Sequence, residues 1–247
     1  MSNYIRGEFY RLFHKKSLII YFIALAVGYV GTMLIRLDTL DAGTLTYDGK
    51  AVYPYLLPLV GGFLFATIYT DDLNSKNLIT LVGFGLEKTK IVMSKFILTA
   101  TTSACIYAFV PLWSYGVLAL FGHPATMSSL GIAYAYALKN MLATLIYVAI
   151  ASVLVYGLQR PTFALVTYIL LALNFISAMV LLLMKLRVFE EIASKVNDYL
   201  VDGVTTNIFL GLTEGGSLAL PLLQFVGYIA VFGLLSILAF KKKEMEF

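Results

Sequence analysis

The sequence predicts an all-α integral membrane protein with six transmembrane helices. Of its 247 residues, 60% are hydrophobic and 13% are charged, whereas about a quarter of the residues in a soluble domain are charged. Long apolar runs, almost free of charge, recur along the chain, and each is long enough to cross a bilayer as a helix. We expect a single transmembrane domain over residues 1–247, with spans at about 18–35, 51–70, 96–121, 134–158, 162–184 and 218–240.

A basic, amphipathic segment precedes the first run. Between residues 3 and 16, apolar side chains recur at helical spacing and basic ones surround them, which is typical of a helix lying in the membrane interface. The predicted apolar face consists of Ile5, Phe9, Leu12 and Phe13. The alternative is that the segment is only the basic flank of the first span. We expect that span to be retained, since it is long and lacks a clear signal-peptide cleavage site.

The second run contains helix-disturbing residues in its outer half, namely Pro54, Pro58, Gly61 and Gly62. Proline removes an internal hydrogen bond and crowds the preceding turn, so this half is expected to be loosened or kinked. Such a kink can serve as a gate or as a packing device, and packing is the favoured interpretation.

Two polar side chains interrupt the later runs. Lys139 falls near the outer end of the fourth run, where a long cationic side chain can extend to the interface. Asn174 lies in the middle of the fifth run, and a single buried amide there is expected to hydrogen-bond across helices rather than to bind a substrate.

A long polar interval, residues 185–217, precedes the last run and is predicted to be an extracytoplasmic loop. Apolar residues recur within it at helical spacing, and an apolar piece, Ile208 to Leu212, follows. We expect one or two short helices here that rest on or dip into the outer leaflet. The helical spacing is set by Val188, Ile192, Val196 and Tyr199.

The distribution of basic residues predicts the orientation. The N-terminal segment, the 71–95 interval, the turn at Arg160 and the C-terminal tail lie on one side of a six-span topology and hold twelve of the eighteen lysines and arginines. Because cytoplasmic loops of membrane proteins are enriched in Lys and Arg, both termini are predicted to be cytoplasmic. The expected location is the cell membrane, with several passes.

The chain lacks the residue sets that common enzyme classes require. The stretch from Gly83 to Lys88 has glycines and a lysine, but not at the spacing of a phosphate-binding loop, so ATP hydrolysis by this chain is not expected. The histidines, His14 and His123, are predicted on opposite sides of the membrane, and Cys105 is the single cysteine. We therefore predict no catalytic residues, no metal site and no bound cofactor. The scarcity of carboxylates in the spans also disfavours ion-coupled transport.

The 71–95 interval has a distinctive order of residues. Acidic Asp71-Asp72 comes first, then Leu78-Ile79-Thr80-Leu81, then Gly85-Leu86-Glu87-Lys88, and Lys95 opens the third span after Ile91-Val92. With this segment, an N-terminal interface helix and six spans, the whole chain resembles the membrane subunit of an ABC type-2 exporter. It departs from that family at Lys76-Asn77, where Gly-Thr is common, and at Lys88, where arginine is frequent.

The resemblance implies a cytoplasmic coupling helix that contacts an ATPase. The coupling residues would be Asp71, Asp72, Leu78, Leu81, Glu87, Lys88 and Lys95. Leu78, Ile79, Leu81 and Val82 form an apolar face that could seat in a groove of a partner protein. The alternative is that the interval is a solvated cytoplasmic loop.

The resemblance also implies partners and cargo. Two copies of a cytoplasmic ABC ATPase subunit would bind ATP and magnesium, and a second permease, identical or homologous, would complete the complex. The apolar spans favour a lipophilic or amphipathic cargo, an antimicrobial peptide or a drug, and nothing suggests nucleic-acid binding. The alternative function is a six-span channel or a membrane scaffold without an ATPase. An intramembrane protease would need a Ser-His pair, an Asp-Asp pair or a metal site inside the spans, and the predicted spans contain none of these.

Overall fold

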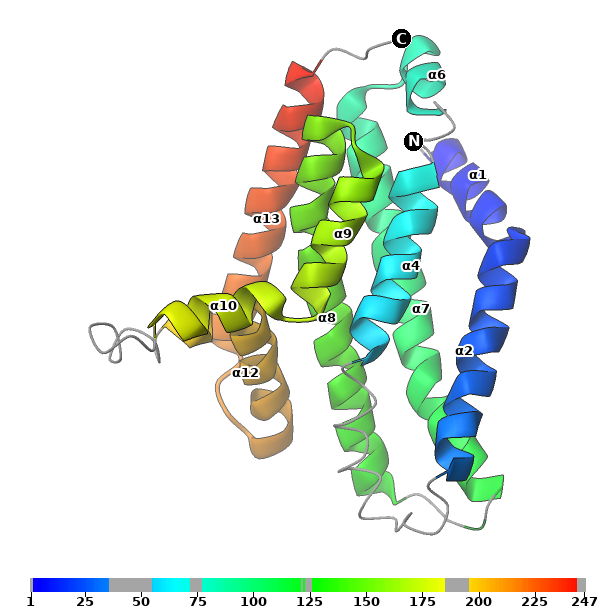
Figure 1. Cartoon of the computed structure of the whole chain (residues 1–247), viewed down its shortest axis with the longest axis vertical. Coiled ribbons are helices and arrows are strands. Elements are labelled where there is room, and N and C mark those ends of the chain that lie inside the picture. Colours follow the sequence, from blue (N-terminus) through cyan, green and yellow to red (C-terminus); the bar gives the residue numbers. More distant parts are fainter. Residues whose placement is uncertain are drawn as a thin grey trace.

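The computed structural model describes residues 2–35, 55–71, 77–120, 122, 126–184 and 196–243. Within these ranges the regular elements are all helical, with no strand among them (Figure 1). The predicted all-α class is therefore confirmed for the described part of the chain. The predicted loop at 36–50 and the first part of the loop at 185–217 lie outside it.

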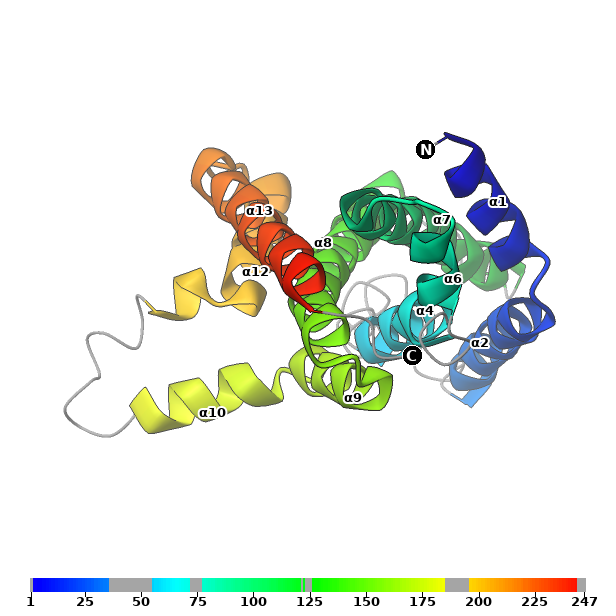
Figure 2. The ribbon, with the colours of Figure 1, turned by 90° about the horizontal axis from the view of Figure 1, so that it is seen from above.

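The bundle consists of helical segments that run along one axis, as the end-on view in Figure 2 makes plain. Both α1 and the C-terminal end of α13 lie at the same end of this axis (Figure 1). The axial segments are α2 (Lys16–Ile35), the continuous segment η2 (Leu57–Gly61), α4 (Gly62–Phe65) and η3 (Ala66–Thr70), then α7 (Lys88–Leu120), α8 (Met127–Leu158), α9 (Pro161–Ala172) and α13 (Ala219–Lys242).

Not all of these segments are long enough to cross a membrane. Among the described residues, α7, α8 and α13 meet the requirement by length and composition. The pair α1 (Ser2–Phe13) and α2, bent by 54° at its break, counts as a fourth if it is one span. The described helices thus supply three to four candidate spans, fewer than the six predicted. The segments 57–70 and 161–172 are apolar but shorter.

The fifth run, predicted as a span over about 162–184, is not one continuous helix. Helix α9 ends at Ala172, and α10 (Phe175–Met184) turns away from the bundle (Figure 1). Asn174 adopts a left-handed backbone with φ of 55°, which asparagine tolerates better than most residues. Its Oδ1 accepts a hydrogen bond of 3.0 Å from the Tyr147 hydroxyl on α8, so the predicted cross-helix bond of Asn174 is confirmed.

The second run is loosened in its outer half, as its prolines and glycines predict, and also in its inner half, which was not predicted. It is π-helical over Leu57–Gly61 and again over Ala66–Thr70. Gly61 lies so close to Tyr168 of α9 that a Cβ atom would fall 1.7 Å from the tyrosine hydroxyl, and that hydroxyl donates to the carbonyl of Leu57 at 3.1 Å. These contacts favour the packing interpretation of the loosened helix.

Helix α8 is the centre of the bundle. It contacts α7, α9, α12 and α13, and residues 142–149 are buried without interruption, as expected for a helix that is apolar all round. Hydroxyl groups join it to its neighbours. Tyr107 of α7 bonds to Thr144 at 3.0 Å, and Ser236 of α13 bonds to Ser152 at 2.7 Å.

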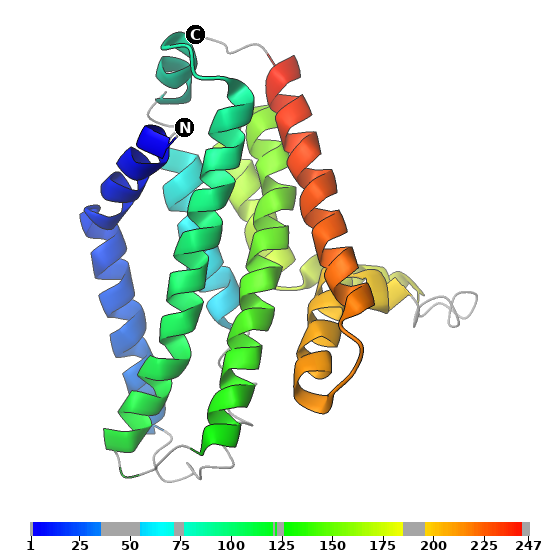
Figure 3. The same ribbon diagram turned by 180° about the vertical axis from the view of Figure 1, so that it is seen from behind.

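A short helix lies directly before the last span, within the interval 185–217. Helix α12 (Val201–Glu214) forms a hairpin with α13 through a turn in which Gly215 has φ of +80° (Figure 3). Its Val204 and Ile208 are buried together with Leu142 of α8. A short helix in this interval was therefore predicted correctly, but α12 packs lengthwise on the bundle. Val188 and Ile192 lie outside the described residues.

Candidate functional site

A short helix caps the end of the bundle that carries α1. Helix α6 (Asn77–Gly83) lies over α4 and α7 (Figures 1 and 2). It ends where Gly85 takes a φ of +83°. The backbone N–H of Gly85 donates to the carbonyl oxygen of Val82 at 2.9 Å, and that of Leu86 donates to the carbonyl oxygen of Leu81 at 3.1 Å. This pattern closes a helix C-terminus around a left-handed glycine. The predicted coupling interval thus contains a defined helix.

The apolar face of α6 is turned toward its own chain. Leu78 is 4% exposed and belongs to the main hydrophobic core, against which Leu81, Val82 and Leu86 also pack. The segment instead presents Phe84, whose side chain is 82% exposed. The sequence analysis did not single out Phe84. The available signal was its place directly before a glycine turn, where it cannot join the helical face.

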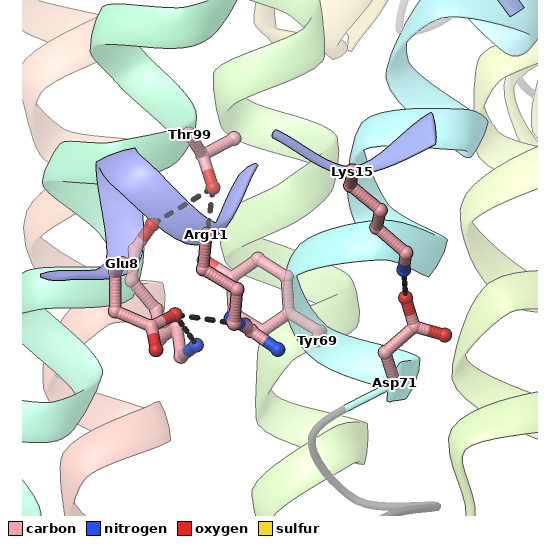
Figure 4. Close-up of polar contacts among 7 residues, drawn as sticks. Glu8, Arg11, Lys15, Tyr69, Asp71 and Thr99 are labelled. Atoms are coloured by element: carbon pink, nitrogen blue, oxygen red, sulfur yellow. Dashed lines mark hydrogen bonds and ion pairs between the residues drawn. The ribbon is translucent and has the colours of Figure 1, made fainter. Parts of the chain in front are cut away.

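A buried ion pair joins α1 to the start of α7. Lys95 Nζ donates to Glu8 Oε2 at 2.5 Å, and Arg11 Nη2 donates to the same oxygen at 2.8 Å (Figure 4). The Lys95 side chain is 1% exposed and that of Glu8 is 14% exposed. Burying a charge is costly unless it is paired, so this contact fixes the N-terminal helix against the bundle.

A second ion pair lies at the break between α1 and α2. Lys15 Nζ contacts Asp71 Oδ2 at the end of η3 (Figure 4). Both side chains are more than one third exposed, so the pair is partly screened by solvent. Between the two pairs, Thr99 Oγ1 donates to the carbonyl of Lys95 at 2.8 Å and lies 3.5 Å from the Tyr69 hydroxyl. Helices α1 and α7 and the end of η3 therefore meet in one polar junction.

The remaining predicted coupling residues follow α6 directly. Lys88 Nζ donates to the carbonyl of Lys243 at 2.9 Å and lies 5.3 Å from the centre of the Phe240 ring, which joins α7 to the end of α13. Glu87 forms an exposed ion pair of 2.8 Å with Lys90. The hydrogen bond from Lys90 lowers the pKa of the Glu87 carboxyl.

The structure therefore brings together only some of the predicted coupling residues. Lys95 contacts Glu8 of α1 and Asp71 contacts Lys15 at the break after α1, whereas Lys88 contacts the end of α13. Glu87 forms its ion pair with Lys90 of the same turn. Asp72 lies outside the described residues. Glu8, which the sequence analysis did not single out, accepts hydrogen bonds from both Lys95 and Arg11.

The predicted interface helix divides its apolar residues between two environments. Leu12 is 2% exposed and lies in the core, and Phe9 packs against that core. Phe13 is 50% exposed, with its ring stacked on Phe9 at 6.2 Å. Ile5 is half-buried. Helix α1 thus packs on the bundle with one edge and leaves Phe13 on the outside.

The sequence matches no protein-family model and no curated protein. Within the described ranges, no group of three or more His, Cys, Asp or Glu side chains is placed to hold a metal ion. The chemistry of the junction is accordingly that of paired charges. Such an arrangement can hold helix ends in a fixed relation and can transmit a displacement from one to another.

Proposed function

We propose that this chain is the membrane subunit of an ATP-driven exporter of the ABC type-2 class. The observation that supports this proposal best is the position of α6. It is a short helix at the end of the bundle with an exposed aromatic residue at its tip, and it leads directly into α7. A partner that displaces α6 therefore acts on a transmembrane helix.

In this proposal, the end of the bundle that carries α1 faces the cytoplasm. The enrichment of lysine and arginine at that end supports the orientation. The six-span arrangement consists of the axial segments listed above. It requires that segments 57–70 and 161–172, which are shorter than a bilayer core, contribute to crossing together with the residues around them.

A separate protein supplies the energy. Two copies of a cytoplasmic ABC ATPase bind ATP and magnesium, and a second permease completes the assembly. When the ATPase subunits close, Phe84 and the α6 tip are pushed, and the buried contact between Glu8 and Lys95 makes α1 move with α7. Lys88 conveys the same displacement to the end of α13. This is a rigid-body transmission between packed helices.

The proposed cargo is lipophilic or amphipathic, an antimicrobial peptide or a drug. Its support is the large apolar surface of the bundle. A cavity of about 240 Å³ between α2, η2 and α7 is lined almost wholly by apolar and aromatic side chains, including Phe22, Val60 and Trp113.

The test compares two exposed apolar residues at opposite ends of α7 and its preceding turn. Phe84→Ala is expected to reduce ATPase binding and ATP hydrolysis in the purified complex, whereas Leu120→Ala, at a residue that is 87% exposed, is expected to leave both unchanged. The reason is that exposed aromatic anchors dominate protein contacts. Equal behaviour of the two variants would remove the support for α6 as the docking element.

A second comparison tests transmission. Lys88→Glu breaks the bond to the Lys243 carbonyl and should lower cargo-stimulated ATP hydrolysis without loss of membrane insertion. Lys90→Glu is the matched control, since Lys90 contacts the neighbouring Glu87 on the exposed side. The transmission scheme is wrong if the Lys88→Glu variant, like the Lys90→Glu control, hydrolyses ATP at the wild-type rate.

A further inference from the structure

A polar cavity lies in the half of the bundle that is remote from α1 and α6. Its volume is about 400 Å³, which is within the range of about 300–1,000 Å³ that small-molecule sites occupy. Side chains from η2, α8, α12 and the break between α9 and α10 line it. None of the coupling residues described above contributes to it.

The cavity contains one cation and one anion in contact. Lys139 Nζ donates to Thr206 Oγ1 at 2.8 Å and lies 3.3 Å from Asp202 Oδ1. The Lys139 side chain is 20% exposed and that of Asp202 is 47% exposed. Because both charges are only partly buried, either can exchange its partner for a charged group of a ligand. A ligand that carries both charges leaves the cavity neutral.

Uncharged polar groups surround this pair. Asn140, Tyr147 and Asn174 line the cavity, and Tyr147 is held by its bond to Asn174. The left-handed backbone at Asn174 places this amide at the corner where α10 turns away. Leu57 and Leu173 supply apolar wall, and Leu173 is 55% exposed. A polar interior thus adjoins an apolar margin.

The depth of the cavity narrows the class of ligand. Lys139 lies 19 positions before the end of α8 at Leu158, which is about 28 Å along the helix axis at about 1.5 Å per residue. The hydrocarbon core of a bilayer is about 30 Å thick. With the cytoplasmic end of α8 at one membrane surface, an orientation that rests on the proposed function, the Lys139 end of the cavity lies at the level of the outer headgroups.

We propose that this cavity binds the zwitterionic head of an amphipathic molecule. The anionic group of the head lies on Lys139 and its ammonium group on Asp202, while the amides and the tyrosine hydroxyl hydrogen-bond the polar atoms between them. The apolar tail leaves past Leu173. The site gives the chain a lipid-like ligand, and its binding needs neither an ATPase nor nucleotide.

The experiment measures ligand binding to the full chain, purified in a nonionic detergent, by native mass spectrometry. The probe is lysophosphatidylethanolamine. Three comparison probes are lysophosphatidic acid, which lacks the ammonium, a monoacylglycerol of the same chain length, which lacks both charges, and glycerophosphoethanolamine, which lacks the tail. The zwitterionic amphiphile is expected to bind at least about tenfold more tightly than each of them, because a charged hydrogen bond or a buried tail is lost in every case.

Lys139→Gln and Asp202→Asn are each expected to weaken this binding about tenfold. The double variant Lys139→Gln/Asp202→Asn leaves neither charge of the pair without its partner. Its binding is measured in place of a single variant that fails to fold. Glu87→Gln, which removes the exposed pair with Lys90, is the control and should bind as the wild type does.

Three results would overturn the proposal. The first is a double variant that binds as tightly as the wild type. The second is equal binding of lysophosphatidic acid or the monoacylglycerol, which would show that the cavity does not recognise the two charges of the ligand head. The third is equal binding of glycerophosphoethanolamine, which would assign the site to a soluble headgroup. Failure of the exporter proposal would leave these measurements unchanged, since they involve no ATPase.

Discussion

The buried contact between Glu8 and Lys95 permits a quantitative test of the junction. Replacing Glu8 with glutamine neutralises the partner of a lysine whose side chain is 1% exposed. Removing one partner of a buried ion pair typically costs about 3–5 kcal/mol. We expect about 3 kcal/mol for Glu8→Gln, since glutamine still offers a carbonyl oxygen and Glu8 is 14% exposed.

The reciprocal change should cost less. In Lys95→Met, the Glu8 carboxylate keeps its 2.8 Å contact with Arg11, so about 1 kcal/mol is expected. The double variant Glu8→Gln/Lys95→Met leaves neither the buried lysine nor the carboxylate at this position, and the remaining Arg11 side chain is 38% exposed to solvent. The double variant should unfold within about 1 kcal/mol of the wild type and should therefore be more stable than Glu8→Gln alone.

The assay is reversible unfolding of the purified chain in mixed micelles, with the free energy of unfolding taken from the denaturant midpoint and slope. Glu87→Gln, which breaks an exposed ion pair of 2.8 Å, serves as the control and should leave the midpoint unchanged. A Glu8→Gln variant that unfolds like this control would refute the predicted contribution of the Glu8–Lys95 pair to the free energy of unfolding. This contribution is also refuted if the double variant loses the sum of the two single losses, because interacting sites are not additive.

Further predictions concern packing between helices and use the same unfolding measurement. Gly61→Ala should destabilise the chain by about 1–3 kcal/mol, because its Cβ would overlap a buried tyrosine hydroxyl, whereas at Gly62 the nearest atom is 3.8 Å away and alanine should be tolerated. Asn174→Leu should be more destabilising than Asn174→Gly, since leucine resists a φ of 55°; the opposite order would exclude backbone strain as the cause. Alanine at Ser152 or Ser236 should each cost about 0.6 kcal/mol, and the double variant should cost no more than one single, because both remove the same 2.7 Å bond.

The sequence alone was sufficient to predict those helices whose formation hydrophobicity determines. The runs that became α7, α8 and α13 were recognisable because their length and lack of charge permit few other structures in a membrane protein. The break between α1 and α2 falls at His14 and Lys15, where the basic amphipathic segment meets the first apolar run. The amphipathic pattern and its boundary were both local signals.

The structural features that the sequence did not predict are determined by tertiary contacts. The fifth run is uninterrupted in hydropathy, yet it bends at Asn174, whose amide contacts Tyr147 on another helix. The partner of Lys95 is Glu8, 87 positions earlier. A lysine flanked by Ile91, Val92 and Leu98 in one helix signals a buried charge that needs a partner. Spacing along the chain does not identify which acid supplies it.

The orientation of α6 shows the same limit. The apolar face over Leu78 and Leu81 was correctly recognised as a helical face, but periodicity does not reveal whether such a face meets another protein or the chain's own core. The structure places Leu78 in its own core. The contact residue of the proposed docking element is consequently Phe84, while the coupling role itself stays a prediction.

The central claim is that a separate ATPase drives this chain. The most direct measurement is purification of the tagged full-length chain from its native membranes, with identification of co-purifying proteins by mass spectrometry and an assay of ATP hydrolysis. We expect a stoichiometric nucleotide-binding subunit and vanadate-sensitive hydrolysis. A chain that purifies alone and without ATPase activity would contradict this claim and would direct attention to ion flux through a channel.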